Sequence, residues 1–185
     1  MLRRRRLLVA SVLAALASQT AAAGTATAAT APEIGRDADT ALERLYAENP
    51  AARALGEKAV GILIFPKVVN GGFGIGGEYG EGILRKAGQP AGYYNLISAS
   101  FGFQIGAQAY SEVLFFMSEE ALGWLDRTYG LELGVDGSVA LAGSGAGGEL
   151  DSASVANPIV AFVFGQQGLM ANATIEGSKI SRIER

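Results

Sequence analysis

Two stretches of this chain alternate apolar side chains with glycine, and this pattern restricts the fold more than any other feature of the sequence. In the first stretch, Phe73, Ile75 and Tyr79 alternate with glycines. In the second, residues 93–110, apolar residues on one face alternate with small or amide residues on the other. Side chains of a β-strand point alternately to its two faces, so both stretches predict long strands with one nearly bare face. Glycine relieves crowding where strands bend, which favours a curved antiparallel sheet or a partly closed barrel.

Turn-forming residues separate these strands from their neighbours. Residues 60–65 form a short apolar run that ends at Pro66, which predicts a buried strand. Asn70-Gly71 is a favoured hairpin dipeptide and predicts a tight turn before the glycine-rich strand. Residues 87–92 predict another turn, and residues 113–117 predict a second buried strand.

Helical spacing is found in two segments. Residues 37–56 repeat apolar side chains at helical intervals, with a break at Asn49-Pro50. Ser118 is placed to cap a further helix that Gly130 ends. We therefore expect the α+β class, with an N-terminal helical segment and one further helix packed on the sheet. The remaining strand predictions are a hairpin about Asp136-Gly137, strands at 159–164 and 169–175, and a turn at 165–168 between them.

The N-terminus predicts an export signal. Arg3-Arg4-Arg5-Arg6 precede an apolar run at 7–17 that is shorter than the roughly 20 residues of a membrane-spanning helix but fits a secretory signal. We assign residues 1–23 to this signal peptide, 24–36 to a flexible tether and 37–185 to a single domain. The sequence thus predicts an exported protein of the periplasm or cell envelope, or a secreted one. An uncleaved membrane anchor is the alternative.

Charge restricts the partners. The chain has 15 basic and 18 acidic residues, and four of the basic ones lie in the predicted signal. An acidic mature protein argues against nucleic acid as a partner. It also argues against strong overall attraction to anionic membranes, although a local basic patch can still act.

The chain contains neither His nor Cys, which removes most catalytic chemistry. Residues 72–77 satisfy G-x-G-x-x-G, but no helical pattern follows them, so nucleotide binding is not expected. Glu78 and Glu81 fall on opposite faces of a strand, so a shared acid–base site is not expected either. A hydrolase built on one of these carboxylates remains the enzymatic alternative. We expect no enzyme, no cofactor and no metal site.

Three groups of residues are candidates for binding. Glu78 lies on the glycine-rich face, where it is either buried and paired or a functional polar contact. Four cations flank strand ends, and they are either simply solvated or form a patch for a lipid headgroup: Lys58, Lys67, Arg85 and Lys86. The helical segment either covers the sheet or lies on a membrane surface, and its membrane-contact residues would be Leu42, Arg44, Leu45 and Arg53.

Several ordered blocks of the sequence resemble the SYLF domain family. They include GILIFP at 61–66, GFGIGGEYGEG at 72–82, SFGFQIGAQ at 100–108 and AFVFGQQGLM at 161–170. Together with shorter blocks, they extend over about residues 58–182. The family includes lipid- and actin-binding proteins of the yeast cortex and exported bacterial lipid-binding proteins, and this chain is similar to the bacterial members.

The resemblance implies lipid binding, with phosphatidylinositol phosphates as ligands of eukaryotic members and membrane phospholipids as ligands of bacterial ones. It also implies that an N-terminal amphipathic helix and basic residues contact the membrane, and residues 37–56, Lys58 and Lys67 occupy comparable places. Actin is not expected as a partner in an exported bacterial setting. We therefore expect a non-catalytic phospholipid-binding envelope protein. The alternative is a scaffolding module that pairs with another protein or with a second copy of the chain through a sheet edge.

Overall fold

In the computed structural model of the protein, residues 29–127, 130–133, 139–142, 157–168 and 177–185 are described. The predicted signal peptide, the turn at Asp136-Gly137 and the predicted strand at 169–175 lie outside this part of the chain. The same holds for the side chains of residues 72–75 and 100–107, so the predicted faces of their apolar residues stay predictions.

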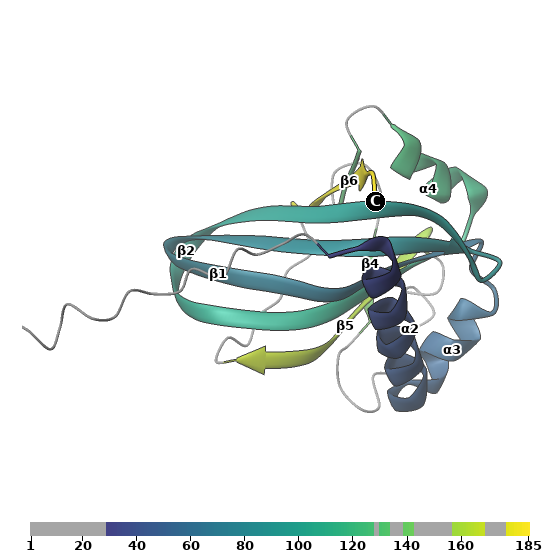
Figure 1. The fold of residues 1–185 in the computed structure, drawn as a ribbon, viewed down its shortest axis with the longest axis horizontal. Helices are drawn as coiled ribbons and strands as arrows, with labels where there is room; N and C mark the ends of the chain where they lie inside the picture. Colours follow the sequence, from purple (N-terminus) through teal and green to yellow (C-terminus); the bar gives the residue numbers. More distant parts are fainter. Residues whose placement is uncertain (1–28, 128–129, 134–138, 143–156, 169–176) are drawn as a thin grey trace, which may run out of the picture.

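Two long strands form the framework of the sheet. β1 (Gly61–Lys86) and β2 (Gln89–Phe116) pair antiparallel along almost their entire lengths. A tight turn joins them at Ala87 and Gly88, whose φ angles are 48° and 76°. Positive φ at both central residues matches a hairpin turn whose twist suits antiparallel strands. Figure 1 shows this two-stranded ribbon curling back over itself.

The other strands join the free edge of β2. Near one end, β5 (Ile159–Gly168) pairs with residues 108–116, and near the other, β6 (Lys179–Ile183) pairs with residues 93–97. Each of these strands pairs with one further short strand. β4 (Val139–Ala142) runs parallel to β5, and β3 (Leu131–Glu132) runs antiparallel to β6. The result is a curved, mostly antiparallel sheet of six described strands.

Glycine allows β1 to fold back on itself. A Cβ at Gly80 would lie 2.9 Å from Val68 Cγ2 and 3.2 Å from the carbonyl oxygen of Lys67, and a Cβ at Gly82 would collide with the carbonyl oxygen of Ile64. Residues well separated within one strand therefore touch backbone to backbone. Only glycine permits so close an approach at these positions.

The core consists of two apolar clusters, one on each face of the sheet. One lies inside the curl and includes residues of α4 (Glu119–Gly123) and the adjoining turn η1 (Trp124–Asp126). The other lies beneath α2 (Ala31–Glu48) and α3 (Pro50–Gly56). Figure 1 shows α2 and α3 well apart from α4. The predicted α+β class, with its curved sheet and covering helices, is confirmed.

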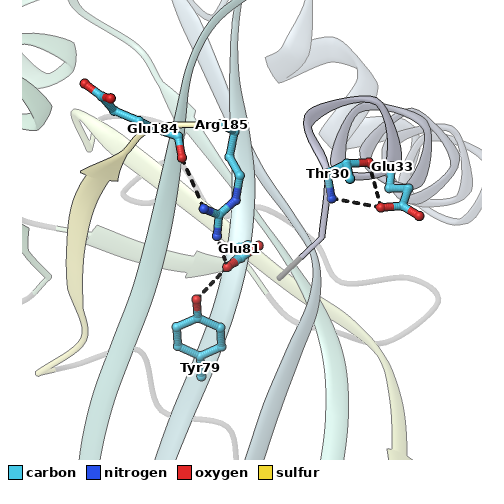
Figure 2. Close-up of polar contacts among 6 residues, drawn as sticks. All are labelled: Thr30, Glu33, Tyr79, Glu81, Glu184 and Arg185. Atoms are coloured by element: carbon cyan, nitrogen blue, oxygen red, sulfur yellow. Dashed lines mark hydrogen bonds and ion pairs between the residues drawn. The ribbon is translucent and has the colours of Figure 1, made fainter. Parts of the chain in front are cut away.

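Local sequence explains how the helices begin. The backbone N–H and hydroxyl of Thr30 both donate to Glu33 Oε2, at 2.8 and 2.6 Å, which caps α2 at its first turn (Figure 2). Asn49 Oδ1 accepts hydrogen bonds from the N–H groups of Ala51 and Ala52, which caps α3. Among the helices of the described residues, none has both the length and the apolar character needed to cross a membrane.

The predicted strand end at Pro66 and most of the predicted turn at 87–92 are strand, because β1 runs through Pro66 and β2 begins at Gln89. The helical residues after Ser118 end at Asp126 rather than near Gly130.

Four further boundaries need correction. Asn70-Gly71 is not a turn, because both residues continue β1 opposite Gln108 and Ala107. The first helix begins at Ala31, so residues 31–36 are helical rather than part of a tether.

The other two corrections concern the C-terminal third. β3 and β4 are not partners in a hairpin, because they pair with β6 and β5 respectively. Residues 165–168 continue β5 instead of turning, with Gly165 at a φ of +67° where the register with β2 shifts. In each case pairing with a distant strand decides the conformation over the local turn signal.

Candidate functional site

A polar groove lies between α2 and the sheet. Its volume is about 420 Å³. It is lined by Asp37, Thr40, Ala41 and Arg44 of α2, Pro66 and Lys67 of β1, Ala109, Tyr110 and Ser111 of β2, and Gly165 of β5. Four elements distant in sequence therefore meet at this groove.

Irregular strand pairing shapes the floor of the groove. The register of β1 against β2 shifts between Phe65 and Val68, around Pro66. Proline has no N–H to give to a ladder, so a bulge there is expected. The Ser111 hydroxyl donates to the Pro66 carbonyl oxygen at 2.8 Å, which holds the bulge against β2. A second shift, between β2 and β5, lies directly beside Ser111.

Arg44 and Lys67 give the groove its positive charge. Arg44 Nε donates to Glu48 Oε1 at 2.8 Å, and both side chains are about half exposed. Arg44 Nη1 lies 2.9 Å from the position that a Cβ on Gly165 would occupy. Lys67 is exposed on the opposite wall. An exposed ion pair such as Arg44–Glu48 contributes little to stability. The guanidinium of Arg44 can therefore leave Glu48 and bind an anion that interacts with it more strongly.

The remaining predicted cations do not join this groove. Arg85 Nη2 is 2.6 Å from Asp39 Oδ1, and its side chain is only 16% exposed. Lys58 is exposed in the link between α3 and β1, and Lys86 is exposed at the hairpin turn. The Arg53 guanidinium lies 4.9 Å from the centre of the Tyr46 ring, within cation–π range. Of the four predicted headgroup residues, only Lys67 lines the groove, and the other three lie elsewhere on the protein.

The predicted membrane face of the helical segment also needs correction. Leu45 is 3% exposed and belongs to the apolar cluster beneath α2, and Leu42 packs against the same cluster. Both side chains thus face the sheet. The sequence allows residues 37–56 either to cover the sheet or to lie on a membrane surface. In the structure they cover the sheet.

Glu78 and Glu81 lie on opposite faces of β1, as the strand period predicts. The side chain of Glu81 is only 9% exposed. The Tyr79 hydroxyl donates to its Oε1 at 2.6 Å, and Arg185 forms an ion pair with the same oxygen (Figure 2). The hydrogen bond to Glu81 raises the pKa of Tyr79. Figure 2 also shows Arg185 Nη1 donating to the Glu184 carbonyl oxygen. The ion pair between Arg185 and Glu81 anchors the C-terminal residues on β1.

Glu78 is buried inside the curl, in agreement with the prediction that it is buried and paired. Asn70 Nδ2 donates to Glu78 Oε1 at 2.7 Å. Burial raises the pKa of Glu78, and the hydrogen bond from Asn70 partly offsets that effect. The Tyr110 hydroxyl lies close enough to influence the pKa of Glu78, but it does not reach hydrogen-bond geometry with any described group.

Sequence reasoning missed the companion of Glu78, which is Glu112. This residue is 0% exposed, and burial together with the charge of Glu78 raises its pKa to about 8. A signal was present, because Gln108, Tyr110 and Glu112 alternate on one strand. Because these residues are far from Glu78 in the sequence, the pattern does not indicate that Glu112 lies near Glu78. Among the described residues, no three His, Cys, Asp or Glu side chains gather in one place.

Comparisons with known proteins agree with the resemblance seen in the sequence. Residues 97–184 match the family described as Ysc84, Las17-binding protein actin regulator, which is the SYLF family. The chain is also 30% identical over 153 residues to a protein named Beta cell expansion factor A from Aeromonas veronii. The matched region covers 79% of this chain and 54% of that protein, so the chain spans about half the length of its curated relative. On this evidence residues 97–184 of the chain match the SYLF family.

Proposed function

We propose that this protein is an exported, non-catalytic phospholipid-binding protein of the cell envelope, and that the groove between α2 and the sheet holds the phosphate of a lipid headgroup. The observation that carries the proposal is that Arg44 and Lys67 line one groove. Both residues are candidate membrane contacts in the sequence. The SYLF family is associated with lipid-binding or actin-binding roles. For an exported protein, this association supports lipid binding.

The two cations suit a phosphate in different ways. The guanidinium of Arg44 is planar and can donate two parallel hydrogen bonds to phosphate oxygens. The ammonium group of Lys67 adds a compact charge from the opposite wall. A phosphate would take the place of Glu48 at Arg44. Because that ion pair is exposed, its loss would cost at most about 1 kcal/mol.

The size and polarity of the groove favour a headgroup over acyl chains. Its volume of about 420 Å³ lies near the lower end of the range for small-molecule sites. Thr40 contributes a hydroxyl to its walls, and the Asp37 carboxylate offsets part of the positive charge of Arg44 and Lys67. In this account the acyl chains stay in the bilayer and the protein lies at the membrane surface.

The whole chain has a net charge of −3, so attraction to an anionic membrane must be local. Local attraction between exposed charges is screened by salt over about 8 Å at physiological ionic strength. Vesicle flotation tests this directly. Purified protein should float with vesicles containing an anionic phospholipid at 50 mM salt, and flotation should fall several-fold at 500 mM. Protein that stays at the bottom with both anionic and neutral vesicles at 50 mM salt would contradict the proposal.

Export is tested separately. A signal peptide ending near residue 23 predicts that protein purified from the cell envelope has lost this segment. Intact-mass measurement gives the answer, because an uncleaved anchor would leave the mass of the full chain unchanged.

One observation favours the alternative of a scaffolding module. Within the described residues, β1 pairs with β2 alone, so its other edge has no strand partner. Tyr79 and Ile97 are cross-strand neighbours on this ribbon, and each is 49% exposed. Unpaired edges recruit strands from other chains. Light scattering that gives only monomer mass, and crosslinking in the envelope that retrieves no partner, would count against this alternative.

A further inference from the structure

The inside of the curled ribbon contains five buried polar side chains, which we call the interior polar cluster. They are Asn70, Glu78, Gln108, Tyr110 and Glu112, and none is more than 6% exposed. Of these five, Tyr110 also lines the phosphate groove, but the proposed phosphate contacts use none of them. Their burial among the apolar residues of the core therefore needs its own explanation.

Strand pairing and the fold of β1 bring the cluster together. Asn70 is directly opposite Gln108 in the register of β1 and β2. Residues 108, 110 and 112 alternate along β2 and so share one face. The bend in β1 returns Glu78 to Asn70, where the 2.7 Å hydrogen bond closes the cluster. Glu78 lies near enough to Tyr110 and Glu112 for its charge to act on both, while Gln108 joins the cluster through its position opposite Asn70.

Most polar atoms of the cluster have no hydrogen-bond partner among the described residues. The five carboxylate and amide oxygens without one are Asn70 Oδ1, Glu78 Oε2, Gln108 Oε1, Glu112 Oε1 and Glu112 Oε2. The Tyr110 hydroxyl and Gln108 Nε2 also lack a partner. Native cores rarely leave buried polar atoms unpaired, because each unpaired group is strongly destabilising. So many polar atoms in one place need partners from outside the described side chains, either ordered water or a bound ion.

We propose that the interior polar cluster binds one hard divalent cation, with Ca²⁺ as the best fit. Hard cations prefer carboxylate and amide oxygens, which are the unpartnered atoms of this cluster. Two carboxylates neutralise one divalent charge, so the loaded site carries no net charge into the core. Ca²⁺ tolerates irregular oxygen geometry better than Mg²⁺, and the ligands here come from three separate strand segments. The cation would join both halves of β1 to β2.

Protons compete with the cation for this site. Glu78 on β1 and Tyr110 on β2 are the titratable groups that face Glu112 among the described residues. A carboxylate must lose its proton before it can ligate a cation, so cation binding at this site releases protons. Binding should therefore be tighter at pH 8 than at pH 6.

Thermal unfolding of the purified protein measures the effect without lipid. The protein is dialysed against a chelator and then unfolded in EDTA, in 5 mM CaCl₂ or in 5 mM MgCl₂, at equal ionic strength. Calcium should raise Tm at pH 8 by about 5 °C, a shift that at 5 mM corresponds to a Kd of roughly a few tenths of a millimolar. The shift should be smaller at pH 6. Isothermal titration should give one Ca²⁺ per chain.

Two variants make the test specific. Glu112→Gln keeps the shape but removes one charge, so it should unfold at a higher temperature than the wild type in EDTA and lose the calcium shift. Glu43→Gln changes an exposed carboxylate on α2 and should keep the full shift. The proposal is overturned if the wild type has the same Tm in EDTA, Ca²⁺ and Mg²⁺ at both pH values, or if Glu112→Gln keeps the calcium shift.

Discussion

Glu112 lies fully buried on β2, and the charge of Glu78 adds to the effect of burial on its pKa. An acid whose pKa is raised on folding binds its proton more tightly in the native state than in the unfolded chain. The native state thus favours the protonated form, and ionisation works against folding.

The first prediction concerns pH. The unfolded pKa of a glutamate is near 4.5 and the folded pKa of Glu112 is about 8, so this residue lowers the free energy of unfolding as pH rises between these values. A shift of this size has an upper bound on the order of 5 kcal/mol. Urea unfolding in EDTA at pH 5, 6, 7 and 8 should show a decline for the wild type and a much flatter profile for Glu112→Gln. Parallel profiles for the two proteins would show that Glu112 does not titrate in this range.

At the scale of elements, alternation and spacing predict much of what the structure contains. The long strands, the α2–α3 break at Asn49-Pro50 and the cap at Ser118 follow from local pattern. The course of β1 through Asn70-Gly71 does not, because pairing with Gln108 and Ala107 overrides a favourable turn dipeptide. Local signals place elements well, whereas tertiary pairing decides where a strand continues.

The second prediction concerns the bend of β1. Gly82→Ala places a methyl group against the carbonyl oxygen of Ile64, and backbone cannot give way as a flexible side chain would. We expect a loss of about 1–3 kcal/mol in the free energy of unfolding, as for other overpacked sites. The matched control is Gly123→Ala at the end of α4, where nothing lies within 4 Å of the added Cβ. Equal stability of both variants in urea unfolding would refute the close approach within β1.

The third prediction separates a docked helix from a membrane helix. Leu45→Ala removes a buried side chain beneath α2 and should cost about 2–5 kcal/mol of unfolding free energy. Val69→Ala, at a 43% exposed position, should cost far less. If Leu45→Ala instead leaves urea unfolding unchanged while vesicle flotation is lost, α2 leaves the sheet to act on the membrane.

At the scale of the whole molecule, the curl of the sheet creates both sites. Folding β1 back on itself buries the interior polar cluster, and laying α2 across the strand bulges forms the groove with Arg44 and Lys67. The sequence identifies these two cations as separate candidates but does not join them. Their meeting depends on where α2 docks against β1 and β5, which no local pattern encodes. For the same reason Glu112 escaped notice, since its neighbour Glu78 comes from the other long strand.

The measurement that tests the central claim most directly compares two charge-matched double variants in vesicle flotation at low salt. Arg44→Gln with Lys67→Gln removes both cations of the groove, whereas Lys58→Gln with Lys86→Gln removes two exposed cations elsewhere. Both variants have the same net charge, so only position distinguishes them. We predict that the groove variant loses at least tenfold in vesicle affinity, which is about 1.4 kcal/mol, while the second stays within about twofold of the wild type. Equal losses in the two variants, or a loss only in the second, would contradict the groove as the phospholipid site.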